Sequence, residues 1–160
     1  MQRLPGILIA ACAIAGCLPV KPPAAELDRQ VEACWDAKLA LNPVYATYLG
    51  DHRYDDRLEM TPSPEYEAAS LALEKRWLAA VQAVDPAALD DERRLTREMF
   101  LYNRESDIAE LGFPGRLLPI SPFDGGMAMV LPMFGAGSGP QPFATVADYD
   151  RWLARAREFP

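Results

Sequence analysis

Residues 63–84, SPEYEAASLALEKRWLAAVQAV, carry the clearest structural pattern in this chain of 160 residues. Apolar or small side chains recur there every three or four positions, at Tyr66, Ala69, Ser70, Leu73, Trp77, Ala80, Val81 and Val84. That spacing places them along one face of an α-helix. Ser63 followed by Pro64 is a typical helix start, because serine can cap the first turn and proline suits its first position. The stretch therefore predicts a long amphipathic helix.

Similar patterns predict helices on both sides of this one. Asp85-Pro86 ends it, and a further helix is expected from about Asp91 to Leu111, ended by Gly112. Its predicted inward residues are Leu95, Met99, Tyr102 and Ala109. Upstream, helical spacing relates Leu27, Val31, Cys34, Trp35 and Leu39. Because long helices with a short connection pack against each other, we expect an all-α fold of antiparallel helices.

Two further helices are predicted at the ends of the folded region. Asn42-Pro43 indicates an N-cap and a first helical residue, starting a short helix that ends at Gly50. Thr145 begins a last helix, with Asp148 placed as the acidic member of a capping box. One face of this last helix would carry Tyr149, Trp152, Leu153 and Ala156.

Residues 113–142 differ in kind, since twelve of these thirty residues are Gly or Pro and large apolar side chains lie between them. This composition excludes a regular helix, and a solvated linker would lack so many apolar groups. We expect a long apolar loop that is functional or packed against another surface. Its stretch from Met127 to Met133 either lines an apolar groove or fills the core.

The start of the chain predicts export. Arg3 precedes an apolar run from Leu4 to Ala15, and the sequence Ile14-Ala15-Gly16-Cys17 is typical of a bacterial lipoprotein signal. We expect a signal peptide at 1–16, a lipidated Cys17, a tether at 17–25 and a helical domain at 26–160. The protein would then be lipid-anchored to the outer membrane or periplasmic. The alternatives are a plain secretory signal, an N-terminal anchor, or cleavage before Cys12. Cleavage before Cys12 would leave a signal peptide with a very short apolar region.

Charge and cysteine content limit the classes of function. The net charge is −7, and removing residues 1–16 takes away only Arg3 and leaves −8. Because an acidic domain repels phosphate backbones, nucleic acid is not expected as a partner. After loss of Cys12 and lipidation of Cys17, Cys34 is the only thiol, so no internal disulfide can form.

The chain contains no complete catalytic motif. Its single histidine, His52, excludes a zinc site built on two histidines, and no Gly-x-Ser-x-Gly elbow, Walker loop or dinucleotide fingerprint is present. The densest polar cluster spans 51–57. Its candidate substrate-facing residues are Asp51, His52, Arg53, Tyr54 and Asp55. The aspartates could also bind a hard cation, although their spacing matches no calcium loop, and a capped, salt-bridged connection between helices is the structural alternative.

The block at 42–58, NPVYATYLGDHRYDDRL, resembles the start of the bacterial proteins grouped as domain-of-unknown-function family 885, many of which are lipoproteins. The likeness continues through 85–89, 117–120 and 142–150, and then through Arg155 and Phe159-Pro160. It covers nearly everything after the tether.

This resemblance implies the N-terminal part of a larger helical protein similar to zinc metallopeptidases of the His-Glu-x-x-His type. In such proteins two histidines and a glutamate hold zinc, and the helix glutamate activates water for attack on a peptide bond. None of those residues can be carried over to this chain. We therefore expect a truncated chain that is catalytically inert, holds no metal and needs the rest of the protein for zinc. The alternative is a complete small helical lipoprotein that binds a ligand or protein partner without catalysis.

The lipoprotein signal gives the first prediction. Cys17→Ala should abolish labelling by a radioactive fatty acid in the bacterial host, because the lipid is attached to the thiol of the residue that follows the predicted cleavage site. Cys12→Ala is the matched control and should leave the labelling intact. The opposite result would move the cleavage site to Cys12, and labelling that survives both changes would contradict the lipoprotein prediction.

Overall fold

The computed structural model describes residues 22–59, 63–117 and 130–159 and is entirely helical over them. The elements are α1 (Pro23–Leu41), α2 (Pro43–Tyr48), η1 (His52–Tyr54), α3 (Pro64–Gln82), η2 (Pro86–Ala88), α4 (Asp91–Glu110), η3 (Gly115–Leu117), α5 (Val130–Gly135) and α6 (Val146–Arg157). The predicted all-α fold is confirmed. None of the described helices is long and apolar enough to cross a membrane. The predicted signal peptide and Cys17 lie outside the described residues.

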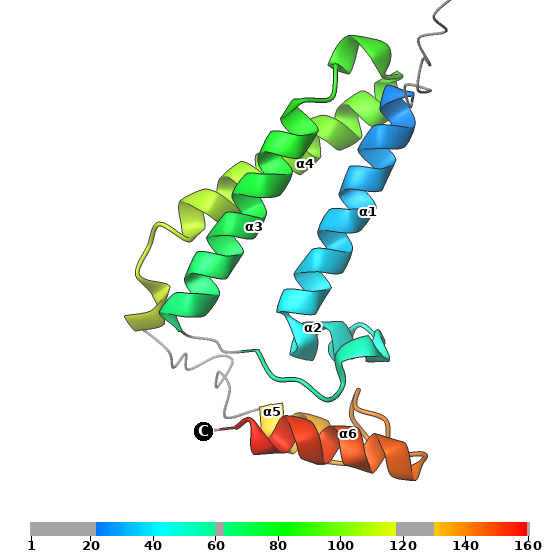
Figure 1. The fold of residues 1–160 in the computed structure, drawn as a ribbon, viewed down its shortest axis with the longest axis vertical. Coiled ribbons are helices and arrows are strands. Elements are labelled where there is room, and N and C mark those ends of the chain that lie inside the picture. Colours follow the sequence, from blue (N-terminus) through cyan, green and yellow to red (C-terminus); the bar gives the residue numbers. More distant parts are fainter. Residues whose placement is uncertain (1–21, 60–62, 118–129, 160) are drawn as a thin grey trace, which may run out of the picture.

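Three long helices form the upper part of the molecule (Figure 1). α3 and α4 pack as an antiparallel pair, and α1 packs against both of them. Near the connection between α3 and α4, the buried core consists of Leu27, Val81, Val84 and Leu89. Below these helices, α2 and η1 lie at the foot of α1, and α6 runs across the bottom.

The helix caps predicted at Ser63 and Thr145 are confirmed. The Ser63 hydroxyl accepts the Tyr66 N–H at 3.1 Å, and Asp85 and Asp90 cap η2 and α4 in the same way. At α6, the Thr145 hydroxyl accepts the Asp148 N–H at 3.3 Å while the Asp148 carboxylate accepts the Thr145 N–H at 2.7 Å. The capping box is therefore complete.

The start of α2 differs from its prediction, because Asn42 does not cap it with its side chain. The Asn42 amide instead donates to the Lys38 carbonyl at 2.8 Å, and its oxygen accepts the Tyr66 hydroxyl. The first free N–H of α2, from Val44, is taken by the Glu59 carboxylate at 2.8 Å. Glu59, seventeen positions downstream of Asn42, thus caps the helix in place of Asn42.

The predicted inward face of α4 is wrong. Leu95, Met99 and Tyr102 are 58%, 57% and 70% exposed, and Ala109 is exposed too. The side of α4 that meets α1 and α3 carries Phe100, Leu101 and Arg104 instead. The helical period alone could not choose between the faces, because arginine stems can cover apolar surface as well as leucines do.

The other predicted faces hold in part. On α3, the side chains of Ser70, Trp77 and Val81 are buried as expected, whereas Ala69 is exposed. Exposure also contradicts the prediction at Trp35 of α1 and at Tyr149 and Leu153 of α6. Ala69, Trp35 and Tyr149 each lie beside a buried residue, so the true contact face is narrower than the apolar stripe.

The boundaries of two other segments are also refined. α1 begins at Pro23, so it takes in the last three residues of the range assigned to a tether. Within the Gly/Pro-rich stretch, where no regular helix was expected, the short helix α5 forms at Val130–Gly135. The part of that stretch at 118–129, with Met127 and Met129, lies outside the described residues.

Two leucines test the orientation of the helices. Leu27→Ala should lower the free energy of unfolding by about 2–5 kcal/mol, since Leu27 is fully buried and leaves a cavity. Leu95→Ala makes the same chemical change on an exposed surface and should alter it by no more than about 0.5 kcal/mol. Urea denaturation followed by circular dichroism measures both. A larger loss at Leu95 would restore the face predicted from the sequence.

Candidate functional site

The polar block at 42–58 folds around one buried cation, Arg155 of α6. Arg155 is 1% exposed, and among the described residues all of its hydrogen-bond acceptors except Gln141 come from this block. Its Nε donates to the Arg57 carbonyl at 2.7 Å, and its Nη1 donates to Gln141 Oε1 at 2.8 Å. Nη2 donates to the Tyr54 carbonyl at 2.7 Å, to Thr47 Oγ1 at 2.8 Å and to the Pro43 carbonyl at 3.3 Å. We call this arrangement the Arg155 socket.

The charge of Arg155 is balanced close by. Asp55 is fully buried, and its Oδ1 accepts the Thr47 hydroxyl at 2.6 Å, next to the contact between Thr47 and Arg155. Burial lowers the pKa of Arg155 from its ordinary value, and the negative charge of Asp55 opposes that shift. An ion buried in this way is tolerated only when hydrogen bonds and an opposite charge replace its water.

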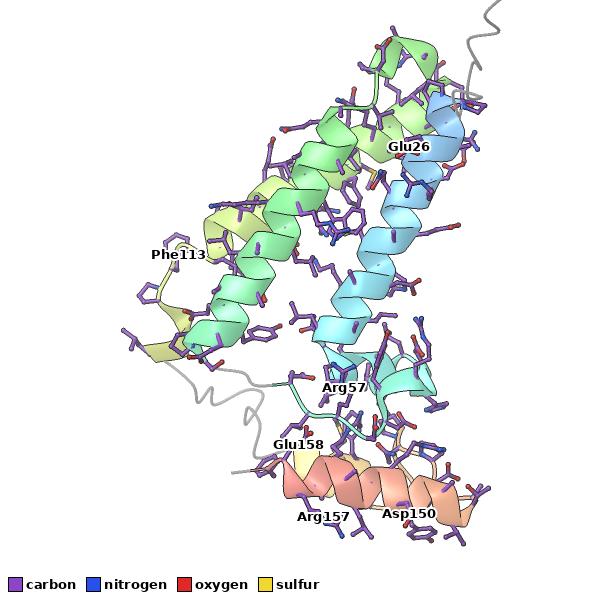
Figure 2. The ribbon with its side chains drawn as sticks, in the orientation of Figure 1. Glu26, Arg57, Phe113, Asp150, Arg157 and Glu158 are labelled. Atoms are coloured by element: carbon purple, nitrogen blue, oxygen red, sulfur yellow. The ribbon has the colours of Figure 1, made fainter. Side chains whose placement is uncertain are left out.

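An apolar cluster encloses the socket on its other side. Phe134 of α5 is fully buried, and its ring centre lies 5.8 Å from the Arg155 guanidinium carbon. Val44, Leu58, Trp152 and Phe159 pack with it. Figure 2 shows Arg57 and Glu158 near the junction with α6, where the Glu158 carboxylate accepts the Leu58 N–H at 2.8 Å. The socket therefore joins α2, η1, α5 and α6 into one unit.

The five candidate substrate-facing residues occupy different environments within this block. Asp55 is buried in the socket, and Tyr54 lies half-buried with the Arg53 and Arg57 guanidinium carbons 5.4 and 5.3 Å from its ring centre. Asp51 caps η1 by accepting the Arg53 N–H at 3.1 Å. The bond to the Arg53 side chain lowers the pKa of Asp51. Arg53 also reaches Asp36 of α1 at 2.8 Å.

His52 combines exposure with a fixed orientation. Its side chain is about half exposed, while its Nδ1 lies 3.0 Å from Oδ2 of the buried Asp55. A carboxylate at Nδ1 fixes the ring and leaves Nε2, on the opposite edge, free to interact with another molecule. His52 and Arg53 are the exposed members of the five.

A second polar site, which the sequence did not predict, lies between the long helices. Glu74 of α3 is almost completely buried, and its carboxylate meets Lys38 Nζ and Arg104 Nε at 2.9 Å each. The Asp107 carboxylate also contacts Lys38 and Arg104 at 2.9 Å each. Burial disfavours the charge of Lys38, but its hydrogen bonds to Glu74 and Asp107 outweigh that effect and raise the Lys38 pKa. Two cations and two carboxylates thus form a neutral network across α1, α3 and α4.

Three residues of this network, Lys38, Glu74 and Asp107, line a cleft of about 430 Å³. The cleft is lined by the foot of α1, the start of α2, the first half of α3 and the end of α4 with the residues that follow it. The only sequence signal for the buried network is that Asp107 follows Arg104 by three residues, a spacing that lets the two side chains pair on one helix. Lys38 and Glu74 are brought to that pair by tertiary packing alone.

Zinc, which the family resemblance implies, finds no suitable ligands in the part of the chain that the structure describes. No group of three or more His, Cys, Asp or Glu side chains there is arranged to hold a metal ion. Lys38 and Arg104 already occupy the carboxylates of the buried network. These residues do not fit the metal.

A family model described as "Bacterial protein of unknown function (DUF885)" matches residues 43–160. The chain belongs to this family. The match confirms the resemblance and contains Arg155 and all of the block around it except Asn42. No curated protein and no solved structure matches this DUF885 chain significantly.

The Arg155 socket gives a stability prediction. Arg155→Met should lower the free energy of unfolding by about 3–5 kcal/mol, because it leaves Asp55 and several carbonyls buried without their partner. Arg157→Met changes an exposed arginine on the same helix and should cost no more than about 0.5 kcal/mol. Urea denaturation measures both variants. Equal, small effects would show that the socket does not hold α6 in place.

Proposed function

We propose that this chain is the N-terminal helical part of an exported, lipid-anchored, zinc-peptidase-like hydrolase that acts on peptides. Its residues support and shape the site, while the zinc ligands and the catalytic glutamate belong to another part of the protein. The zinc would supply an activated water for attack on the peptide carbonyl. On this proposal, residues 1–160 alone are inactive.

The observation that carries the proposal is a pair of apolar helix faces that no described element covers. On α4 the face consists of Leu95, Met99 and Tyr102, with spacings of four and three residues. On α6, Val146 is 78% exposed and lies on one face with the exposed Tyr149 and Leu153. Since soluble monomers seldom expose large apolar patches, these rows favour packing against further polypeptide. Further helices of a larger enzyme would provide it.

The geometry of His52 supports a role in substrate binding. Asp55 orients the imidazole of the half-exposed His52, and Nε2 can donate to or accept from a peptide bond. Arg53 lies beside it; Asp51 and Asp36 hold its guanidinium through Nε and Nη2, and the rest of its five N–H donors can pair with a substrate carboxylate. We propose that these two residues, at a helix end beside the substrate channel, position the peptide, while Asp51, Tyr54 and Asp55 hold them in place. The membrane contact of the protein would be its lipid anchor at Cys17.

The second candidate function is a small helical lipoprotein that binds a partner or ligand without catalysis. The same exposed faces on α4 and α6 favour it, because a partner protein could cover them equally well. The two candidates differ in zinc content and in turnover of peptides.

The protein expressed from its complete gene tests the hydrolase. It should contain stoichiometric zinc by metal analysis and should release fragments from a peptide library, detected by mass spectrometry and abolished by a chelator. His52→Ala should raise KM by about fivefold with little change in kcat, as expected for one lost hydrogen bond to the substrate. Asp56→Asn, an exposed change in the same block, should leave both parameters unchanged.

Three results would contradict parts of the proposal. A stop codon directly after Pro160, or a zinc-free protein without activity on any peptide, would favour the binding lipoprotein. If His52→Ala leaves kcat and KM unchanged, the 51–57 cluster has a purely structural role.

A further inference from the structure

The exposed apolar row on α4 continues along most of the helix with the spacing of a coiled-coil seam. Its members are alternately four and three residues apart, at Leu95, Met99, Tyr102, Ser106 and Ala109. All five are exposed, and Leu95, Met99 and Tyr102 are each more than half exposed. This alternation fills positions a and d of the heptad, the repeat by which one helix packs lengthwise against another. We call this row the α4 seam.

The basic side chains of α4 lie away from the seam. Its four arginines, at 93, 94, 97 and 104, fall at heptad positions that neither form the seam nor flank it. Each of them already contacts a carboxylate or a carbonyl of the protein, namely Asp28 for Arg93, Asp91 for Arg94, Val84 for Arg97 and Glu74 for Arg104. The arginines of α4 therefore bring no positive charge to the seam.

One flank of the seam is acidic along its length. Asp91, Glu98 and Glu105 are each seven residues apart, so they form a single row, and all three are exposed. This row is heptad position g, which in a coiled coil faces charged residues of the partner helix. Asp91 also suits the start of a helix, but Glu98 and Glu105 lie beyond the first turn, where that effect ends. The row thus favours a partner with lysine or arginine opposite it.

The same charges disfavour a second copy of this chain as the partner. Antiparallel pairing of two α4 helices would set the acidic row against itself. Parallel pairing would set it against the other flank of the seam, which carries Thr96, Asn103 and Glu110 and no positive charge. Like charges placed opposite each other oppose association, so the seam does not complement itself.

We propose that the α4 seam packs against an amphipathic helix of the remaining part of the full-length protein, with apolar residues facing the seam and lysine or arginine facing the acidic row. This source of the helix rests on the proposed function, in which the chain is part of a larger enzyme. Burial of the apolar row drives the packing, and the acidic row selects the basic partner. Within residues 22–59, 63–117 and 130–159, no element covers the seam.

Binding of a designed peptide to the 160-residue chain tests the seam. The basic peptide has about three heptads, with leucine at positions a and d and with lysine at e and g, and its lysines oppose pairing with itself. Isothermal titration calorimetry should show saturable binding that weakens at high ionic strength. A matched peptide with glutamate in place of these lysines should bind about tenfold more weakly, because several favourable flanking pairs become repulsive.

Matched substitutions locate the binding on α4. Leu95→Lys places a charge inside the seam and should weaken binding of the basic peptide by about tenfold or more. Leu153→Lys makes the same change on the exposed face of α6 and should leave binding unchanged. Circular dichroism checks that both variants keep their helices.

A second pair of variants tests the acidic row. Glu98→Gln combined with Glu105→Gln should weaken binding of the basic peptide about threefold and should strengthen binding of the acidic one. Glu32→Gln removes an exposed charge from α1 and should change neither affinity. Equal effects of the double variant and Glu32→Gln would contradict the role of the row.

The basic peptide also tests the source of the partner helix. In the protein expressed from its complete gene the seam should be filled, so the peptide should bind about tenfold more weakly, or less, than to residues 1–160. Equal binding to both would overturn this source in favour of a separate partner protein. A dimer of the 160-residue chain in analytical ultracentrifugation that Leu95→Lys dissociates would overturn it in favour of a second copy.

Three outcomes would overturn the seam itself. They are equal binding of the basic and acidic peptides, no saturable binding of either, or equal effects of Leu95→Lys and Leu153→Lys. The readout is peptide binding, which requires neither zinc nor turnover. A zinc-free, inactive full-length protein would therefore contradict the hydrolase and leave the seam standing, whereas failure of the peptide to bind would leave the zinc and turnover tests unaffected.

Discussion

The burial of the Arg155 charge is the constraint on which the lower half of the molecule depends. A guanidinium has five N–H donors, and a buried one must find acceptors for them within the protein. In this chain the acceptors are carbonyls of Pro43, Tyr54 and Arg57, with Thr47 and Gln141. Carbonyls can converge in this way only where the backbone turns sharply. That sharp turn is formed by the short α2, by Gly50 at φ 87° and by η1. The unusual residue pattern of the 42–58 block therefore has a structural cause.

The upper half is ordered by a second polar network rather than by apolar packing alone. Leu27, Val81, Val84 and Leu89 form the core near the turn between α3 and α4. Towards the other end, Glu74 and Arg104 take the place of apolar residues between the helices. Apolar contacts tolerate sliding of one helix past another, whereas a buried ion pair does not, because a shift leaves both charges without partners. The network therefore fixes the register of α1, α3 and α4, and it leaves the cleft beside it.

The sequence was sufficient for features that depend on near neighbours. Ser63, Asp85, Asp90 and the Thr145 and Asp148 pair act within three residues of themselves, and their helix starts follow from short-range chemistry. Features that depend on residues far apart in the sequence could not be predicted from the sequence. Glu59 replaces Asn42 at α2, and Lys38, Glu74 and Asp107 meet only after three helices pack. Leu95, Met99 and Tyr102 show the same limit, since their spacing gave a face but not the neighbour that would cover it. Of the candidate site, the sequence located the 51–57 cluster but not the role of Arg155 behind it.

The six residues of α2 connect the two polar sites of the chain. Tyr45 lines the cleft, whereas Thr47 and the Pro43 carbonyl hold Arg155. Asn42, at the junction, is fixed by Lys38 on one side and Tyr66 on the other, and both of these residues line the cleft. A short helix tied at both ends has little freedom to tilt without breaking hydrogen bonds that are buried. The position of Tyr45 in the cleft is consequently determined by the same contacts that seat α6, so the geometry of one site constrains that of the other.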